Sequence, residues 1–231
     1  LGQVIEAVRS LLGKNHQGEI DARALRIGQM HDNVRAGWSE RARDNWDSRP
    51  MTLARLSSEV WQQIKDEDWV LTSGTLHDWA RRLWDFDRPW CHGGRELGTG
   101  TQIGTALGVA LANKGTGRLV VDLQPDGDLM FDAGALWIAA KYRIPMLIVM
   151  YNNRTYGNDL GHQGTMAQVR GRPDENKTIG IDIDDPFVDF VGLARSFGAW
   201  AEGPIERIED LSEAFERARK EVVDNGRVAL V

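Results

Sequence analysis

The sequence predicts an α/β fold in which a doubly wound parallel sheet carries helices on both faces. Two continuous apolar runs, Leu119 to Leu123 and Met146 to Tyr151, are rich in β-branched residues, as is typical of strands buried on both faces. Between them, from about 132 to 142, apolar residues recur at helical spacing. A strand, a helix and a second strand in this order predict a right-handed crossover between parallel strands.

A polar turn follows each of these two strands. Asp126 comes after the first strand and Asn153 after the second, and parallel neighbours end at the same edge of a sheet, where open α/β sheets bind ligands. A carboxylate, an amide oxygen and a backbone carbonyl, which Thr155 could supply, are the ligands that suit Mg²⁺ when a phosphate completes the shell. Gly127 and Gly157 would let backbone N–H groups approach phosphate oxygens closely.

These turns resemble the motif of thiamine diphosphate-dependent enzymes, in which Gly-Asp-Gly is followed after a fixed spacer by Asn-Asn. Asn153 follows Asp126 by 27 positions, and the segment ALWIAAKYRIPMLIVMYNNRTYG is similar to the benzoylformate decarboxylase and acetolactate synthase type. The resemblance implies that thiamine diphosphate and Mg²⁺ are the cofactors, with Asp126, Asn153 and Thr155 on the metal. The implied contacts to the diphosphate loop are Asp126, Gly127, Asp128, Asn153, Thr155, Tyr156 and Gly157.

One residue departs from the family pattern at this motif. Pro125 stands where the family has its first glycine. Because proline fixes φ near −65° and has no N–H, it is harmless only if that position uses a negative φ and donates no hydrogen bond. Taken singly, an Asp after a strand and an Asn-Asn before a turn also occur as ordinary caps and turns.

Two further segments resemble cofactor contacts of the same family. The turn after the predicted strand 69–72 holds Gly74, Thr75 and His77, and the family uses a turn in this place for the diphosphate. A simple helix cap by Thr75 is an equal alternative. The glycine-rich loop before 102 resembles the family segment that supports the bent cofactor and offers it a backbone carbonyl, which aligns with Leu97 or Thr99.

Composition describes an ordinary globular protein. The 231 residues are 42% hydrophobic and 27% charged, with a net charge of −6. The sequence has no basic stripe for nucleic acid and no apolar run of membrane-spanning length. Neither nucleic acid nor a membrane is therefore expected as a partner. The one cysteine, Cys91, excludes an internal disulfide and fits a reducing cytoplasm.

The chain is expected to have two parts. Residues 1–48 are interpreted as the tail of a preceding middle domain, with a short amphipathic helix at 2–12 and a polar linker over 13–49. Residues 49–231 are interpreted as the thiamine diphosphate domain, opening at Pro50-Met51-Thr52. The remaining predicted elements are helices at 53–64, 78–83, 186–197 and 210–223, the last with a cap at Asp210, and strands at 69–72, 200–201 and 228–231.

The resemblance implies decarboxylation of a 2-oxo acid, acyl carboligation, or both. No part of the chain resembles the pyrimidine-binding domain whose glutamate activates the cofactor, so that domain is expected on another chain or a missing segment, in a homo- or hetero-oligomer. A 2-hydroxyacyl lyase of the same superfamily and a non-catalytic subunit that retains the fold are the alternatives. A plain nucleotide-binding domain would require a glycine-rich turn that 73–78 does not provide.

The polar segment 158–185 is predicted to be a lid. Its length and its position directly after the second turn are typical of functional loops. His162 is the candidate catalytic residue, as a proton shuttle near neutral pH, and Arg170 or Arg172 could hold a substrate carboxylate. A solvated surface loop is the alternative.

Overall fold

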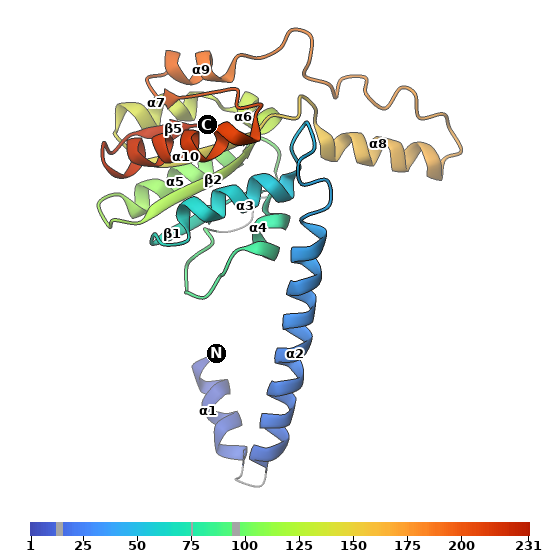
Figure 1. Cartoon of the computed structure of the whole chain (residues 1–231), viewed down its shortest axis with the longest axis vertical. Coiled ribbons are helices and arrows are strands. Elements are labelled where there is room, and N and C mark those ends of the chain that lie inside the picture. The colour runs from blue at the N-terminus through green and yellow to red at the C-terminus, as the bar shows by residue number, and fades with distance from the viewer. Residues whose placement is uncertain (13–15, 75, 94–97) are drawn as a thin grey trace. The chain divides into compact units, whose positions relative to one another are not determined.

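A computed structural model of the chain describes residues 1–12, 16–74, 76–93 and 98–231, which form two compact units, Leu1–Asp44 and Asn45–Val231 (Figure 1). The first unit contains α1 (Gly2–Leu11) and α2 (Gln17–Arg41), and neither helix buries a residue. The segment predicted as a polar linker is mostly helical, because α2 is a regular helix of 25 residues. Its Ala, Arg, Gln and Glu residues favour a helix without any apolar stripe.

The second unit is built on one sheet of five parallel strands in the order β1-β2-β3-β5-β4 (Figure 1). The parallel sheet confirms the predicted fold class. The strands are β1 (Trp69–Thr72), β2 (Leu119–Pro125), β3 (Met146–Tyr151), β4 (Trp200–Ala201) and β5 (Val228–Leu230). β2 is two residues longer than its apolar run, because Gln124 and Pro125 pair with Met150 and Tyr151 of β3.

Helices cover both faces of the sheet, as expected for a doubly wound fold. One hydrophobic cluster joins the sheet to α3 (Leu53–Ile64), α4 (His77–Leu83) and α10 (Ile208–Val223). The other cluster joins it to α5 (Gln102–Asn113), α6 (Asp126–Phe131), α7 (Gly134–Lys141) and α9 (Phe190–Ser196). Each strand therefore contributes alternate side chains to two separate cores.

Several helices differ from their predicted bounds. The helix expected at 132–142 begins at Gly134, because Asp132, at φ −145° and ψ 51°, separates it from the additional helix α6. α9 begins at Phe190 rather than 186, and Asp189 caps it by accepting the N–H of Gly192 at 2.8 Å. α10 begins two residues before Asp210, so the expected cap there is wrong.

The expected lid contains a helix rather than only a loop. α8 (Gly157–Val169) covers the first half of the segment 158–185 and buries no residue. Its side chains show no amphipathic pattern, and it includes Gly161 and Gly164. Because its apolar residues do not recur at helical spacing, the sequence pattern did not predict this helix.

The two edge strands differ in how they end the sheet. β1 is flanked by the loop around Cys91, since the Leu71 N–H donates to the Cys91 carbonyl and the Leu71 carbonyl accepts the Gly93 N–H, both at 2.8 Å. β4, at the other edge, has only two residues. The backbone groups on the open side of β1 are thus already paired at Leu71.

An aromatic cluster anchors β1 to the helices that cover it. Trp84 is fully buried, stacks on Trp61 with ring centroids 5.8 Å apart, and meets Trp69 edge to face at 5.5 Å. Its indole N–H donates to the Ser57 carbonyl of α3 at 2.8 Å. Burial, ring contacts and a satisfied donor act together at this position.

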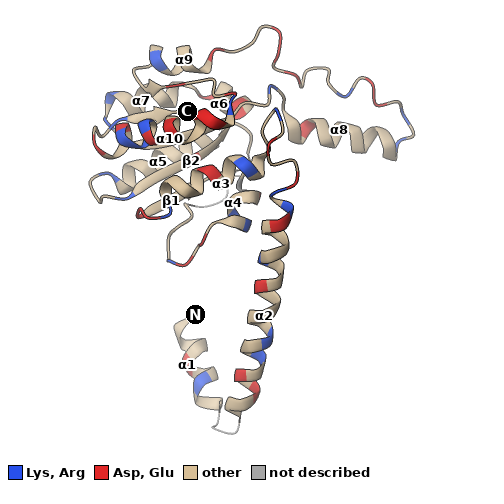
Figure 2. Cartoon of the chain, viewed as in Figure 1, with Lys and Arg blue, Asp and Glu red and all other residues tan. Residues whose placement is uncertain are grey.

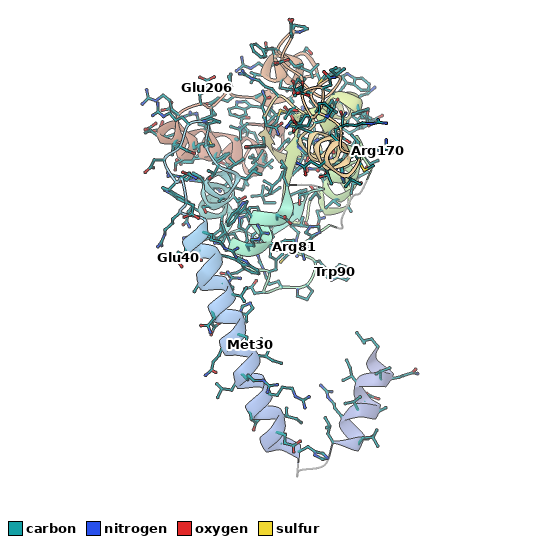
Figure 3. The ribbon with its side chains drawn as sticks, turned by 90° about the vertical axis from the view of Figure 1, so that its right-hand side faces the viewer. Met30, Glu40, Arg81, Trp90, Arg170 and Glu206 are labelled. Atoms are coloured by element: carbon teal, nitrogen blue, oxygen red, sulfur yellow. The ribbon has the colours of Figure 1, made fainter. Side chains whose placement is uncertain are left out.

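We therefore expect Trp84→Ala to lower the free energy of unfolding by about 3 to 5 kcal/mol, the usual cost of removing a buried tryptophan. The matched control is Trp90→Ala, because Trp90 is 80% exposed on the loop after α4 (Figure 3). The control should change the unfolding free energy by less than about 0.5 kcal/mol. Urea titration followed by circular dichroism measures both, and equal losses would refute the anchoring role.

Candidate cofactor site at the carboxyl edge of the sheet

The site begins where β2 passes into α6. Pro125 is the last residue of β2 and the N-cap of α6, with φ −69° and ψ 144°. This φ lies in the range that the proline ring imposes, so proline requires no strain in this turn. Pro125 also lies opposite Tyr151 in the strand register, so the turns that follow β2 and β3 start at the same level.

The carboxylate of Asp126 joins these two turns. Its side chain is 1% exposed, and Oδ2 accepts the N–H of Arg154 at 2.7 Å while Oδ1 accepts the N–H of Gly127 at 2.8 Å. Burial raises the pKa of Asp126, and the backbone hydrogen bonds oppose that effect. The structure thus brings Asp126 against the Asn153–Arg154 backbone, as the parallel topology predicts.

The second turn presents two further oxygen atoms. Asn153 is exposed, and its Oδ1 accepts the N–H of Thr155 at 3.2 Å. The Thr155 carbonyl accepts the N–H of Gly157 at 2.9 Å. Between them Arg154 adopts a left-handed backbone with φ 59°, which aims its N–H at Asp126. Each oxygen accepts one hydrogen bond and has a second lone pair left for a ligand.

Tyr156 packs directly on Gly127. A Cβ atom at position 127 would overlap the Tyr156 ring, whose hydroxyl donates to the Gly127 carbonyl at 3.5 Å. The same ring meets Phe131 of α6 edge to face, with centroids 6.0 Å apart. Only glycine therefore allows this approach between the first turn and the residue that precedes α8.

The edge carries a negative field. Asp128 lies in the first turn of α6 and Asp159 in the first turn of α8. Burial raises the pKa of the Tyr156 hydroxyl most, and the charges of Asp126, Asp128 and Asp159 raise it further. Among the described residues no three His, Cys, Asp or Glu side chains gather to hold a metal ion. A cation here would use one carboxylate with the Asn153 amide and Thr155 carbonyl oxygens, a hard set that suits Mg²⁺.

The glycine-rich loop also reaches the first turn. The Gly100 N–H donates to Asp128 Oδ1 at 3.1 Å, and Gly100 has φ 83° with Phe131 packed against its Cα, where a side chain would be excluded. Thr99 is exposed on this loop. Leu97 and Thr75 lie outside the described residues. His77 is the first residue of α4, and its side chain is not described.

A buried amide and carboxylate lie beneath these turns, and our sequence analysis did not identify them. Gln102 of α5 is 1% exposed and Asp122 of β2 is fully buried. Gln102 Nε2 donates to Asp122 Oδ1 at 2.8 Å, and Gln102 Oε1 accepts the N–H of Gly74 at 2.7 Å. Thr72 of β1 also donates to Asp122 Oδ1, at 3.1 Å. Polar residues inside an apolar strand and a buried helix face were the available signal.

This network leaves one carboxylate oxygen without a partner. Asp122 Oδ2, Gln124 Oε1 and Ser73 Oγ are buried and find no hydrogen-bond partner within the described part of the chain. Burial raises the pKa of Asp122 to about 7, although the bonds from Gln102 and Thr72 act to lower it. Near neutral pH the buried carboxyl is therefore partly protonated.

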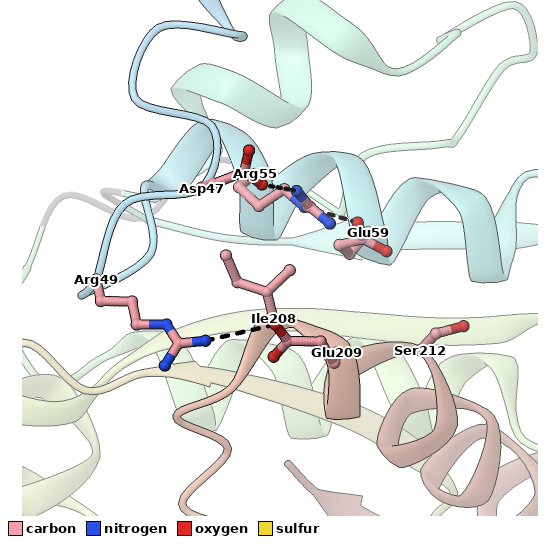
Figure 4. A pocket seen from close by; sticks show the side chains of 7 residues that line it. All are labelled: Asp47, Arg49, Arg55, Glu59, Ile208, Glu209 and Ser212. Atoms are coloured by element: carbon pink, nitrogen blue, oxygen red, sulfur yellow. Dashed lines mark hydrogen bonds and ion pairs between the residues drawn. The ribbon is translucent and has the colours of Figure 1, made fainter.

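A separate cavity of about 450 Å³ lies between α3, α10 and the segment before Pro50 (Figure 4). Its charged lining residues pair with one another: Arg55 bonds to Glu59 at 2.7 Å and to Asp47 at 3.5 Å, and Arg49 bonds to Glu209 at 3.4 Å. These pairs leave little uncompensated charge to attract a ligand. We therefore interpret the cavity as a packing feature of the α3–α10 surface.

Surface charge and helix hydropathy agree with the composition. Figure 2 shows acidic and basic residues interspersed along the ribbon rather than gathered in a basic stripe. None of the helices in the described ranges is both long and apolar enough to cross a bilayer. The candidate site at the carboxyl edge thus has acidic and neutral oxygen groups as its distinguishing chemistry.

Residues 72–231 match the sequence profile described as "Thiamine pyrophosphate enzyme, C-terminal TPP binding domain". The chain is 32% identical over 121 residues to a benzoylformate decarboxylase of Pseudomonas aeruginosa, covering 52% of this chain and 21% of that protein. It is 28% identical over 208 residues to the acetolactate synthase isozyme 3 large subunit of Escherichia coli, covering 83% and 34%.

Solved structures agree with these sequence relatives. A thiamine diphosphate-dependent 4-hydroxybenzoylformate decarboxylase of Rhodococcus jostii superposes with a TM-score of 0.62 at 27% identity, over 79% of this chain and 32% of that one. A putative thiamin diphosphate-dependent enzyme of Mycobacterium smegmatis, at 21% identity and TM-score 0.59, shares the fold. The chain spans about a third or less of each curated relative reported above.

The raised pKa of Asp122 predicts a pH dependence of stability. Because the folded state binds the proton more tightly than the unfolded state, the contribution is full below about pH 4 and is lost as pH rises to about 7. We expect the wild-type chain to lose about 1.4 kcal/mol of unfolding free energy per pH unit over this interval, relative to Asp122→Asn.

Denaturant titrations at several pH values measure this difference. The control is Asp184→Asn, because Asp184 is exposed. It should follow the wild-type curve. Parallel pH curves for wild type and Asp122→Asn would contradict the assignment.

Proposed function

The chain belongs to the thiamine pyrophosphate enzymes and carries their C-terminal cofactor-binding domain, and on this basis we propose that it supplies the diphosphate and Mg²⁺ site of a 2-oxo acid decarboxylase or acyl carboligase. The relatives named benzoylformate decarboxylase and acetolactate synthase support this reaction class. A 2-hydroxyacyl lyase would use the same cofactor contacts and is the alternative within the family.

The observation that carries the proposal is the contact between Asp126 and the second turn. A carboxylate that is 1% exposed accepts the Arg154 N–H at 2.7 Å, beside the Asn153 amide and the Thr155 carbonyl. The free lone pairs of these three groups form an oxygen-only set. We assign Mg²⁺ to Asp126, Asn153 and the Thr155 carbonyl, in an edge that is otherwise negative.

Other residues of the edge are proposed to hold the diphosphate. α8 begins at Gly157, directly after the second turn, so the positive end of its helix dipole lies at that turn. Gly74, Gly127, Asp128 and Tyr156 line the turns at the same edge, and Thr75, His77, Leu97 and Thr99 remain proposed contacts. Asp128 has a positioning role, since it holds the Gly100 N–H of the glycine-rich loop.

When bound, thiamine diphosphate acts as the electron sink for cleaving or forming a bond next to a carbonyl. This chain orients the phosphate end, and Asp126 keeps the two turns together while its charge is balanced by Mg²⁺. The acid that activates the cofactor is proposed to come from a pyrimidine-binding domain outside these 231 residues. The proposal is supported by the family relationship and by the fact that the chain covers only about a third of these relatives.

His162 remains a proposed proton shuttle, with α8 as the element that carries it. Its side chain is exposed, and α8 buries none of its residues. The helix is therefore already formed but not packed, and we propose that it is covered when the partner domain is present. Arg170 ends this helix and Arg172 follows it, as candidate groups for a substrate carboxylate.

The alternative of a non-catalytic subunit rested on Pro125. Its φ of −69° is the value that the proline ring imposes. Pro125 is the N-cap of α6, and α6 requires no N–H donor at that position. Pro125 therefore imposes no strain on the turn that carries Asp126, which supports the catalytic assignment. The catalytic assignment is the one that we pursue.

We expect Asp126→Asn and Asn153→Ala each to weaken the binding of thiamine diphosphate in the presence of Mg²⁺ by tenfold or more, about 1.4 kcal/mol. The first change removes the negative charge and keeps one acceptor, for the Arg154 N–H, while the Gly127 N–H loses its partner, so circular dichroism is used to check that the variant is folded. The second removes an exposed amide ligand. Isothermal titration calorimetry with each variant measures the dissociation constant.

The control for these variants is Asn225→Ala. Asn225 is an exposed amide just before β5, at the amino end of the strands and so away from the proposed site at their carboxyl end. It should bind as the wild type does. Wild-type affinity in both Asp126→Asn and Asn153→Ala would remove the metal assignment.

The isolated chain should turn over neither pyruvate nor benzoylformate when supplied with thiamine diphosphate and Mg²⁺. Co-expression with a pyrimidine-binding domain of the acetolactate synthase type should produce turnover, because that domain brings the activating glutamate. Carbon dioxide release measures the difference. Activity of the isolated chain would place the activating acid within these residues.

The same assay tests His162. In the complemented enzyme, His162→Ala should lower turnover, whereas His31→Ala, in the first unit, should not. Full activity of His162→Ala would leave His162 as a surface residue.

A further inference from the structure

We propose that Gln102 is a positioning residue that sets the place of the Ser73–Gly74 turn relative to Asp126, and so tunes the affinity for the diphosphate group. This inference rests on the proposed function, because it concerns the same edge of the sheet. The residues that carry it are Gln102 of α5, Asp122 of β2 and Gly74 after β1. None of them is among the metal ligands assigned above.

One side-chain amide connects three elements. Gln102 Oε1 accepts the N–H of Gly74 at 2.7 Å, and Nε2 donates to Asp122 Oδ1 at 2.8 Å and to the Leu123 carbonyl. The side chain is 1% exposed, so water does not compete for these bonds. The turn after β1 is thereby tied through α5 to the carboxyl half of β2.

The direction of the amide is determined by its partners. The Leu123 carbonyl can only accept a hydrogen bond, and Asp122 Oδ1 already accepts the Thr72 hydroxyl at 3.1 Å. The NH₂ group of Gln102 must therefore face β2, which leaves the amide oxygen to face the Gly74 N–H. Asp122 thus orients Gln102, and Gln102 orients the turn.

The turn that Gln102 holds lies at the proposed cofactor edge. Thr72, the last residue of β1, pairs with Asp122 in the parallel register, and Asp126 follows Asp122 by four positions. Gly74 and Asp126 are thus carried by neighbouring strands that end on the same side. A shift of the Gly74 turn would change the distance between the two proposed diphosphate contacts, and small misplacements are costly in preorganised sites.

The test measures the dissociation constant of thiamine diphosphate with saturating Mg²⁺ for the full chain carrying Gln102→Met. Methionine keeps the length and removes all three hydrogen bonds, and we expect affinity to fall at least tenfold. The control is Ile103→Val, a truncation of the next, fully buried residue of α5. It perturbs helix packing without touching Gly74, and its affinity should equal that of the wild type.

A reciprocal pair separates positioning from general stability. Gln102→Glu places two carboxyl groups together and should weaken binding. Adding Asp122→Asn restores one hydrogen bond between the positions, because the introduced asparagine can donate to one oxygen of the introduced glutamate, whose other oxygen accepts the Gly74 N–H. The Leu123 carbonyl regains no donor, so the recovery should be partial. In conditions where circular dichroism shows both variants to be fully folded, the double variant should therefore bind more tightly than Gln102→Glu alone, because stability then no longer limits binding.

The outcomes distinguish this inference from the function on which it rests. A wild-type chain that binds no thiamine diphosphate overturns the proposed function and the inference with it. A wild-type chain that binds, with Gln102→Met binding equally well, overturns the inference alone. If Gln102→Met does not fold, the reciprocal pair decides: recovery in the double variant supports positioning, and its absence rejects it.

Discussion

The parallel pairing of β2 with β3 is the constraint on which the candidate site depends. It ends both strands on one edge, with Pro125 opposite Tyr151, and the Asp126 carboxylate then joins the two turns through the Arg154 N–H. This hydrogen bond joins residues 28 positions apart, and it fixes the two turns against each other at the carboxyl end of the strands, where open α/β sheets bind ligands. The close approach of Tyr156 to Gly127 and the left-handed backbone at Arg154 accompany this contact in the same two turns.

Much of the fold could be predicted because buried parallel strands are continuous apolar runs. β1, β3, β4 and α3 all have the predicted bounds. The misses occur where hydrophobic periodicity carries no information. α2 and α8 are helices that bury nothing, so helix propensity and local hydrogen bonds decide their conformation. The break at Asp132 depends on a backbone turn that apolar spacing does not report.

Some residues of the site could likewise be predicted from the sequence, and others could not. The convergence of Asp126 with the Asn153 turn follows from strand direction and could be derived before any coordinates. The Gln102–Asp122 pair could not, because each residue is polar within an otherwise apolar element and only tertiary packing reveals the partner. Buried polar residues with no local explanation are thus worth marking in a sequence, since they must find one another in the fold.

The arrangement of the sheet edges bears on how this chain behaves away from other domains. Exposed strand edges are templates on which further strands can add, and they are a common origin of aggregation. Here one edge is a two-residue strand, and at the other Leu71 already exchanges hydrogen bonds with Cys91 and Gly93. Neither edge offers a long unpaired ladder. In the described part of the second unit, one edge is therefore limited by the shortness of β4 and the other by the loop that pairs with β1, two devices that disfavour edge-to-edge association.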